Sequence, residues 1–220
     1  MHVFYLHGFA SSPASSKAAF LAARLAPYGA TLHVPDLNAP DFSTLTTTRM
    51  VAQVRADLAA LRPASAVLVG SSLGAFVAWH VAAQEEASGH PPVALVLLAP
   101  ALDFGHHRMA GLSDAEFDAW RATGWHTFQH YATGEPRRVH YALFDDARRY
   151  DSWATPVRTR ALVLMGRHDA VVSPAMVRRF CDANRNVRLV WLDDDHQLDS
   201  SLERIWEESA AFLGLGIAGR

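Results

Sequence analysis

One serine of the chain sits in a frame that suits a nucleophile. Residues 68–76 read LVGSSLGAF, so Ser72 lies between Gly70 and Gly74 in a Gly-x-Ser-x-Gly pattern, whereas no glycine frame fits Ser71. In a sharp strand-to-helix turn, the residues two before and two after the apex come too close together to carry side chains. A serine at that apex is strained, and its oxygen projects from the turn. The pattern therefore favours Ser72 as a nucleophile.

The partners that a nucleophilic serine needs follow later apolar runs of the chain. A serine hydroxyl is a weak nucleophile and requires a base, usually a histidine that a carboxylate orients. Asp169 follows the run ALVLMG (161–166), and His196 follows the run VRLVWL (187–192). The order serine, acid, histidine is the one that strand-end triads on a nucleophile elbow use. These positions predict acyl-transfer chemistry by Ser72, His196 and Asp169.

The acid has competitors. Three consecutive aspartates, residues 193–195, directly precede His196. We interpret them as a solvated acidic turn, but any of them could replace Asp169, so the acid stays open at this point. His168 adjoins Asp169, and since neighbouring loop residues rarely point at one another, we expect it to be partly exposed.

Acyl transfer also needs donors for the negative charge that develops on the carbonyl oxygen. Backbone N–H groups supply them in serine hydrolases. One donor is expected from Leu73, the residue after the nucleophile, and the other from the segment LHGFASSP (6–13). In that segment Gly8 lets the backbone turn inward, the N–H of Phe9 is the expected donor, and His7 is expected to stabilise the loop by hydrogen bonding.

The elements that must hold these residues alternate along the chain. Short runs rich in Val, Leu and Phe are typical of parallel strands that are buried on both faces. These runs are 2–6, 31–37, 66–70, 93–99, 161–166 and 187–192. Amphipathic helical patterns fill the intervals and the end, at 15–29, 46–63, 74–89, 173–186 and 199–214. The alternation predicts a single α/β domain over 1–220, with a doubly wound, mostly parallel six-stranded sheet flanked by helices.

One segment interrupts the alternation. Residues 103–157 show no convincing strand, and a connection of that length in a compact domain is usually functional. We interpret it as a helical lid over the strand ends; the alternative is a helical subdomain that only extends the core. The segment is rich in aromatic residues: Trp120, Trp125, Phe128, Tyr131, Tyr141, Phe144, Tyr150 and Trp153.

These motifs together resemble the α/β-hydrolase superfamily over nearly the whole chain, and the opening YLHGFASSPASSKA is similar to small bacterial carboxylesterases. The matching stretches are 7–9, 70–74, 166–169 and 195–196. The resemblance implies Ser72 as nucleophile, His196 as base and Asp169 as acid, with the N–H groups of Phe9 and Leu73 as oxyanion donors. It also implies that neither a metal nor an organic cofactor is needed. The chain begins at the strand before the oxyanion loop, so we expect a minimal version of the fold.

The composition of the chain restricts its partners and its cellular location. The net charge is only −2 and 50% of the 220 residues are hydrophobic, which disfavours nucleic acid as a partner. Cys181 is the only cysteine, which excludes an intrachain disulfide, and we expect it to pack in a helix. The first residues lack a basic, signal-length apolar segment and no membrane span is evident, so we expect a cytoplasmic protein. A monomer and a homodimer both remain open.

The expected function is hydrolysis of carboxylic esters with short to medium acyl chains, acting on a small-molecule ester. Thioesters or carbon–carbon bonds cleaved by the same triad are the alternative. A second alternative is a non-catalytic binding protein with the same fold. A third is a metal-dependent enzyme, which the segment HTFQH suggests because it would place His126 and His130 one turn apart on a helix.

Overall fold

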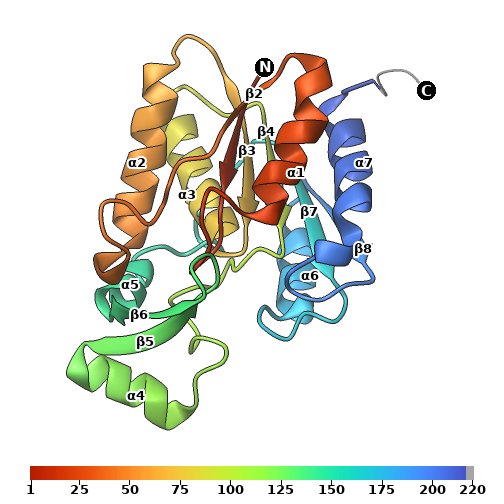
Figure 1. Cartoon of the computed structure of the whole chain (residues 1–220). Coiled ribbons are helices and arrows are strands. Elements are labelled where there is room, and N and C mark those ends of the chain that lie inside the picture. Colours follow the sequence, from red (N-terminus) through yellow and green to blue (C-terminus); the bar gives the residue numbers. More distant parts are fainter. Residues whose placement is uncertain (217–220) are drawn as a thin grey trace.

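The computed structural model describes residues 1–216 and contains a six-stranded sheet, in which every neighbouring pair of strands is parallel. The strand order is β2-β1-β3-β4-β7-β8 (Figure 1). The strands are β1 (His2–Leu6), β2 (Thr31–His33), β3 (Ala66–Ser71), β4 (Ala94–Leu98), β7 (Ala161–Gly166) and β8 (Val187–Leu192). The predicted α/β class and six-stranded parallel sheet are confirmed.

The strands form where continuous apolar runs can be buried on both faces. All residues of β4 and β7 are buried, as are the first five residues of β3. The edge strand β2 is shorter than the predicted 31–37. Pro35 follows it closely, and a proline has no N–H with which to continue the ladder.

Helices cover both faces of the sheet. In Figure 1, α1 lies beside α7 on one face, and α2 lies beside α3 on the other. On that second face α6 contacts α3 through the rings of Phe180 and Trp79, whose centroids are 5.0 Å apart. The helices are α1 (Ser16–Leu25), α2 (Thr47–Ala60), α3 (Leu73–Ala87), α4 (Asp114–Thr123), α5 (Ala142–Ala147), α6 (Pro174–Ala183) and α7 (Leu202–Leu213), with 3-10 turns at Ala26–Tyr28, Phe42–Thr44 and Asp199–Ser201.

The insertion between β4 and β7 contains α4 and α5 and, in addition, an antiparallel hairpin that the sequence pattern did not predict. The hairpin strands are β5 (Trp125–His130) and β6 (Glu135–His140). The insertion has a small aromatic core around Trp120, which is fully buried and donates its indole N–H to the carbonyl oxygen of Val139 at 3.0 Å. It lies at the end of the sheet toward which the parallel strands point (Figure 1).

The sheet order creates a crevice at that end. From β1 the chain crosses to β2 on one side, whereas β3 continues to β4 on the other side. Loops that leave neighbouring strands in opposite directions form the ligand-binding crevice of open α/β sheets. The loops after β1 and β3 carry the predicted oxyanion donor and the predicted nucleophile.

The turn from β3 into α3 fits only if two positions lack side chains. A Cβ added to Gly70 would lie 2.6 Å from the Cα of Ala75, and one added to Gly74 would lie 2.7 Å from the carbonyl oxygen of His7 and would also overlap the Leu6 carbonyl. Both separations are shorter than real Cβ contacts. The glycine frame therefore lets the start of α3 touch the end of β1.

We expect Gly74→Ala to destabilise the fold by about 3 kcal/mol, because the new methyl group must displace buried backbone. Urea unfolding of wild type and variant measures the change. Gly216→Ala is the matched control, since nothing lies within 4 Å of an added Cβ there. Equal midpoints for Gly74→Ala and wild type would show that the turn tolerates a side chain.

A buried histidine makes the fold sensitive to acid. His80 on α3 is 3% exposed, and its Nε2 lies 3.2 Å from the hydroxyl of Ser152, beyond α5. Burial lowers the pKa of His80 to about 4, against a smaller opposing effect of Asp151. The unfolded chain therefore binds a proton in a pH range where the folded chain does not.

We expect the free energy of unfolding to fall as the pH drops from about 6.5 to about 4, with His80 contributing roughly 3 kcal/mol. His80→Gln should be less stable at pH 7 but should lose less stability across this window. Burial also lowers the pKa of His7 and His130, so the slope should decrease rather than vanish. Urea titrations at several pH values decide the point, and identical slopes for the two proteins would contradict it.

Candidate active site

The structure brings the serine, the histidine and one acid together in a hydrogen-bonded chain. His196 Nε2 lies 3.0 Å from Ser72 Oγ, and His196 Nδ1 lies 2.7 Å from Asp169 Oδ2. A carboxylate only accepts hydrogen bonds, so Nδ1 carries the proton and Nε2 presents its lone pair to the serine hydroxyl. This arrangement can withdraw a proton from Ser72 as its oxygen attacks an electrophile.

The carboxylate of Asp169 is held on both of its oxygens. Oδ1 accepts hydrogen bonds from the backbone N–H groups of Val171 and Val172, each at 2.8 Å, and Oδ2 faces His196. Its side chain is fully buried. Because the two backbone donors fix the carboxylate, its rotation cannot release the imidazole.

The other three aspartates take different partners. Asp193 pairs with His168 at 2.7 Å on the surface. Asp194 accepts from the N–H of Asp195 at 2.8 Å, and Asp195 accepts from a backbone N–H two residues further on. None of these three carboxylates is hydrogen-bonded to the imidazole of His196. Asp169 is therefore the carboxylate that His196 Nδ1 contacts.

Ser72 occupies the apex of the turn with a left-handed backbone, at φ 51°. Such a conformation costs about 1–3 kcal/mol in a residue other than glycine. Its N–H donates to the carbonyl oxygen of Leu98 at 2.8 Å, and its carbonyl accepts from the N–H of Ala75 at 3.0 Å. The hydroxyl of Ser71 instead interacts with Tyr5, so of the two serines only Ser72 meets His196.

The two expected oxyanion donors lie beside the nucleophile. Leu73 follows Ser72 directly at the start of α3. A Cβ added to Gly8 would lie 3.5 Å from the Cβ of Ser72, so the loop that carries Phe9 runs directly alongside the nucleophile. Within residues 1–216 neither the N–H of Phe9 nor that of Leu73 has a hydrogen-bond partner. Both donors are thus free to bind an incoming oxygen.

The orientation of the Phe9 N–H follows from contacts of His7. His7 Nδ1 lies 2.9 Å from the carbonyl oxygen of Gly8, which also accepts from the N–H of Ser11 at 3.3 Å. His7 Nε2 accepts from the N–H of Leu37 at 3.1 Å. In a trans peptide the C=O and the following N–H point in opposite directions. By holding the Gly8 carbonyl, His7 therefore directs the Phe9 N–H the other way.

The hairpin of the insertion holds the far side of the same loop. The N–H of Tyr131, just after β5, donates to the carbonyl oxygen of Ala10 at 2.8 Å. The ring of Phe9 packs edge-on against Phe128 at 5.1 Å, and it also contacts Phe42 at 5.6 Å. The loop is therefore held between the sheet and the insertion.

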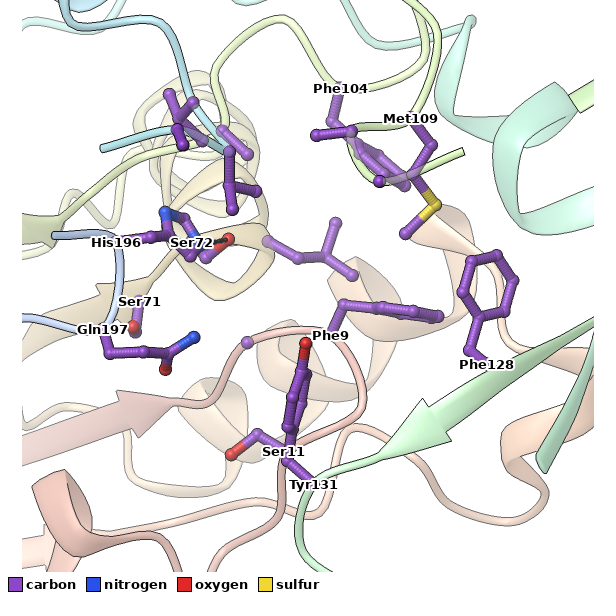
Figure 2. Close-up of a pocket in the computed structure, with 18 of the residues that line it drawn as sticks. Phe9, Ser11, Ser71, Ser72, Phe104, Met109, Phe128, Tyr131, His196 and Gln197 are labelled. Atoms are coloured by element: carbon purple, nitrogen blue, oxygen red, sulfur yellow. Dashed lines mark hydrogen bonds between the residues drawn. The ribbon is translucent and has the colours of Figure 1, made fainter. Parts of the chain in front are cut away.

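Ser72 and His196 open into a cavity of about 1280 Å³. Its walls come from the loop after β1, the start of α1, the insertion, and the loops after β7 and β8. Figure 2 shows Phe104, Met109 and Phe128 on the side of the cavity that lies away from His196.

The histidine pair suggested as a metal site lies on a strand, which corrects the helical spacing on which that suggestion rested. His126 and His130 both belong to β5, and an offset of four positions along a strand separates them by about 13 Å. His130 is buried against the ring of Phe42, with centroids 4.8 Å apart. Among the described residues, no group of three or more His, Cys, Asp or Glu side chains could hold a metal ion.

Comparison with solved structures identifies the class of fold. The chain has the α/β-hydrolase fold. A family model described as "Uncharacterised protein family (UPF0227)" matches residues 2–213, so the chain belongs to that family. No curated protein matches the chain in sequence. Within residues 1–216, no helix combines the length and the apolar character that a bilayer span requires.

Three structures illustrate the likeness. Est1E from Butyrivibrio proteoclasticus with bound ferulic acid has a TM-score of 0.85 at 19% identity, over 99% of this chain and 90% of that one. A protein from Agrobacterium vitis S4 has a TM-score of 0.83 at 24% identity, over 96% and 87%. The monoacylglycerol lipase of Paleococcus ferrophilus has a TM-score of 0.75 at 14% identity, over 96% and 93%. At these identities the likeness concerns the fold.

Sequence reasoning missed the backbone donors that hold Asp169. The stretch DAVV (169–172) contains a signal for them, because an aspartate side chain commonly accepts from the N–H groups two and three residues later. It also missed the hydroxyl-bearing wall of the cavity at Ser11, Ser12, Ser15 and Ser16. Serines in a loop indicate only a turn until the fold shows what they face.

Removal of the His7 ring should reduce catalysis through the orientation of Phe9. We expect His7→Ala to lower kcat by about 10- to 100-fold with little change in KM, because an oxyanion donor acts mainly on the transition state. His7→Asn should recover part of the loss, since its amide can donate near the position of Nδ1. Burial lowers the pKa of His7, with Asp36 opposing, so the imidazole stays neutral near the usual histidine pKa of about 6.5. The loss of kcat in His7→Ala should therefore not depend on pH between about 6 and 8.

Steady-state kinetics on a chromogenic ester measure these effects. A rise in KM with kcat unchanged, or equal losses in the alanine and asparagine variants, would contradict a positioning role for His7.

Proposed function

We propose that the protein is a serine hydrolase that cleaves carboxylic esters through an acyl-enzyme, with Ser72 as nucleophile, His196 as general base and acid, and Asp169 as the orienting carboxylate. The observation that carries the proposal is the pair of hydrogen-bond contacts that joins the three side chains. His196 lies 2.7 Å from Asp169 Oδ2 and 3.0 Å from Ser72 Oγ. These side chains border a cavity large enough for a small-molecule ester.

The reaction follows from the geometry. As Ser72 Oγ attacks the ester carbonyl, its proton passes to His196 Nε2, and the charge of Asp169 stabilises the imidazolium. The carbonyl oxygen becomes negative and takes hydrogen bonds from the N–H groups of Phe9 and Leu73. The alcohol then leaves with the proton from His196, and a water molecule activated by the same imidazole hydrolyses the acyl-enzyme.

The strained turn supports this assignment. Backbone strain persists where the surroundings over-determine it, and such sites cluster where function requires them. The strained residue Ser72 carries a hydroxyl 3.0 Å from the imidazole of His196. The N–H groups of Leu73, the next residue, and of Phe9, in the adjacent loop, have no partner within residues 1–216. A turn with only a structural role would not require these features together.

The names of two structural neighbours are consistent with the proposal. Est1E is described with ferulic acid and the Paleococcus enzyme as a monoacylglycerol lipase. From the cavity size we expect this protein to accept short to medium acyl chains. Thioesters and carbon–carbon bonds remain the alternative substrates of the same triad.

The test is hydrolysis of p-nitrophenyl esters across acyl lengths by the wild type, Ser72→Ala and Ser71→Ala. We expect Ser72→Ala to lose roughly 10⁴-fold or more in kcat, since the nucleophile is removed. Ser71→Ala, the neighbouring serine that does not meet His196, should lose less than about 10-fold.

Two outcomes would count against ester hydrolysis by this triad. Full activity of Ser72→Ala would show that Ser72 is not the nucleophile. If the wild type hydrolyses no oxygen ester but hydrolyses the matched thioesters, the substrates of the triad are thioesters.

A further inference from the structure

The walls of the cavity differ in chemistry on the two sides of Ser72. Figure 2 shows Ser71 and Gln197 on the side of His196, and Phe104, Met109 and Phe128 on the opposite side. A substrate that spans Ser72 therefore meets polar groups at one end and aromatic and thioether groups at the other.

The reaction itself decides which half of an ester lies on which side. His196 Nε2 must give its proton to the leaving oxygen, so that oxygen has to come within hydrogen-bond distance of the imidazole. The leaving alcohol thus lies on the side of Gln197, the next residue in the chain. The acyl group lies on the other side of Ser72, against the ring of Phe128 and its neighbours.

Two hydrogen-bonding groups on the polar side of the cavity have no partner among the described residues. The hydroxyl of Ser11 and the side-chain amide of Gln197 line the cavity, and within residues 1–216 neither has a hydrogen-bond partner. The hydroxyls of Ser12, Ser15 and Ser16 also line the cavity but already have partners in Ala14, Ala18 and Asp199. The unpartnered hydroxyl and amide reward a ligand that carries hydroxyls, because a hydroxyl can both donate and accept.

The charges of the cavity wall are largely compensated. Lys17 is 9% exposed, and its ammonium pairs with the carboxylate of Asp199 at 3.0 Å, which Ser16 also approaches at 3.4 Å. Arg108 pairs with Asp114 at 3.3 Å. Arg179 on α6 also lines the cavity and forms no ion pair within residues 1–216. A leaving group with several negative charges would need more than one such unpaired cation. The wall therefore suits a neutral polar alcohol better than a polyanionic one.

We propose that the substrate is an ester of an apolar acyl group with a neutral polyhydroxy alcohol, of the glycerol or sugar kind, and that Ser11 and Gln197 bind the hydroxyls of that alcohol. This inference rests on the proposed ester hydrolysis and adds the class of substrate. The alternative site for the alcohol is the apolar wall of Val171 and Val172, which would favour an alkyl alcohol.

The experiment compares two esters of one medium-chain fatty acid, the 1-glyceryl ester and the n-propyl ester, which differ only in two hydroxyls. We expect a wild-type kcat/KM at least about 10-fold higher for the glyceryl ester, of the order that a few hydrogen bonds provide. Gln197→Met combined with Ser11→Ala should remove most of this preference. Gln53→Met, the same exchange on α2 outside the cavity wall, should keep it.

A second variant separates the two sides. Phe128→Ala should alter the discrimination between short and medium acyl chains while the preference for the glyceryl alcohol persists. Loss of the alcohol preference in Phe128→Ala would overturn the division of the cavity, as would equal rates on the two esters, a preference for the propyl ester, or a preference that survives the double substitution.

Failure of the proposed function is recognised separately. If the wild type hydrolyses neither these esters nor p-nitrophenyl esters, ester hydrolysis fails, and calorimetric binding of the two intact esters to Ser72→Ala decides the polar side by itself. Tighter binding of the glyceryl ester would support the polar side, and equal binding would overturn it.

Discussion

The close contact between the start of α3 and the end of β1 is the constraint on which the rest of the site depends. It requires a residue without a side chain at Gly74, because any Cβ would overlap the backbone of Leu6 and His7. This contact places the apex of one loop beside the other, so Ser72 and the free N–H of Phe9 lie together. In the proposed reaction, the attacking oxygen and the donors for the resulting charge therefore come from loops of adjacent parallel strands, which the sheet holds in register.

A second set of contacts makes the site rigid in advance of any substrate. Asp169 is fixed by two backbone N–H groups, and it fixes His196 in turn. Preorganised dipoles and charges stabilise a transition state without the cost of reorientation during the reaction. The folding free energy that maintains the strained backbone of Ser72 comes from the buried strands β3, β4 and β7 around it.

Local patterns predicted the sheet well because each buried parallel strand is a short continuous apolar run, and the glycine frame identified the sharp turn at Ser72. The order of the motifs favoured Asp169 among four aspartates, but sequence could not exclude the other three, because the answer depends on which carboxylate the fold turns toward His196. The hairpin escaped prediction because WHTFQH and EPRRVH contain mostly polar or aromatic residues with a proline, and their partly exposed strands carry no apolar run. The contrast between the two sides of the cavity also arises only when distant loops meet.

The contacts of the insertion limit how a lid could work here. The hairpin is joined to the oxyanion loop by the hydrogen bond from Tyr131 to Ala10 and by the packing of Phe128 on Phe9. A lid that swung away as one body would break both contacts and release the loop that carries the Phe9 N–H. Movement of the hairpin would therefore disable the oxyanion donor as it opened the cavity. The stretch 107–112 between β4 and α4 lines the cavity without belonging to the hairpin, so a movement confined to it would leave both contacts in place.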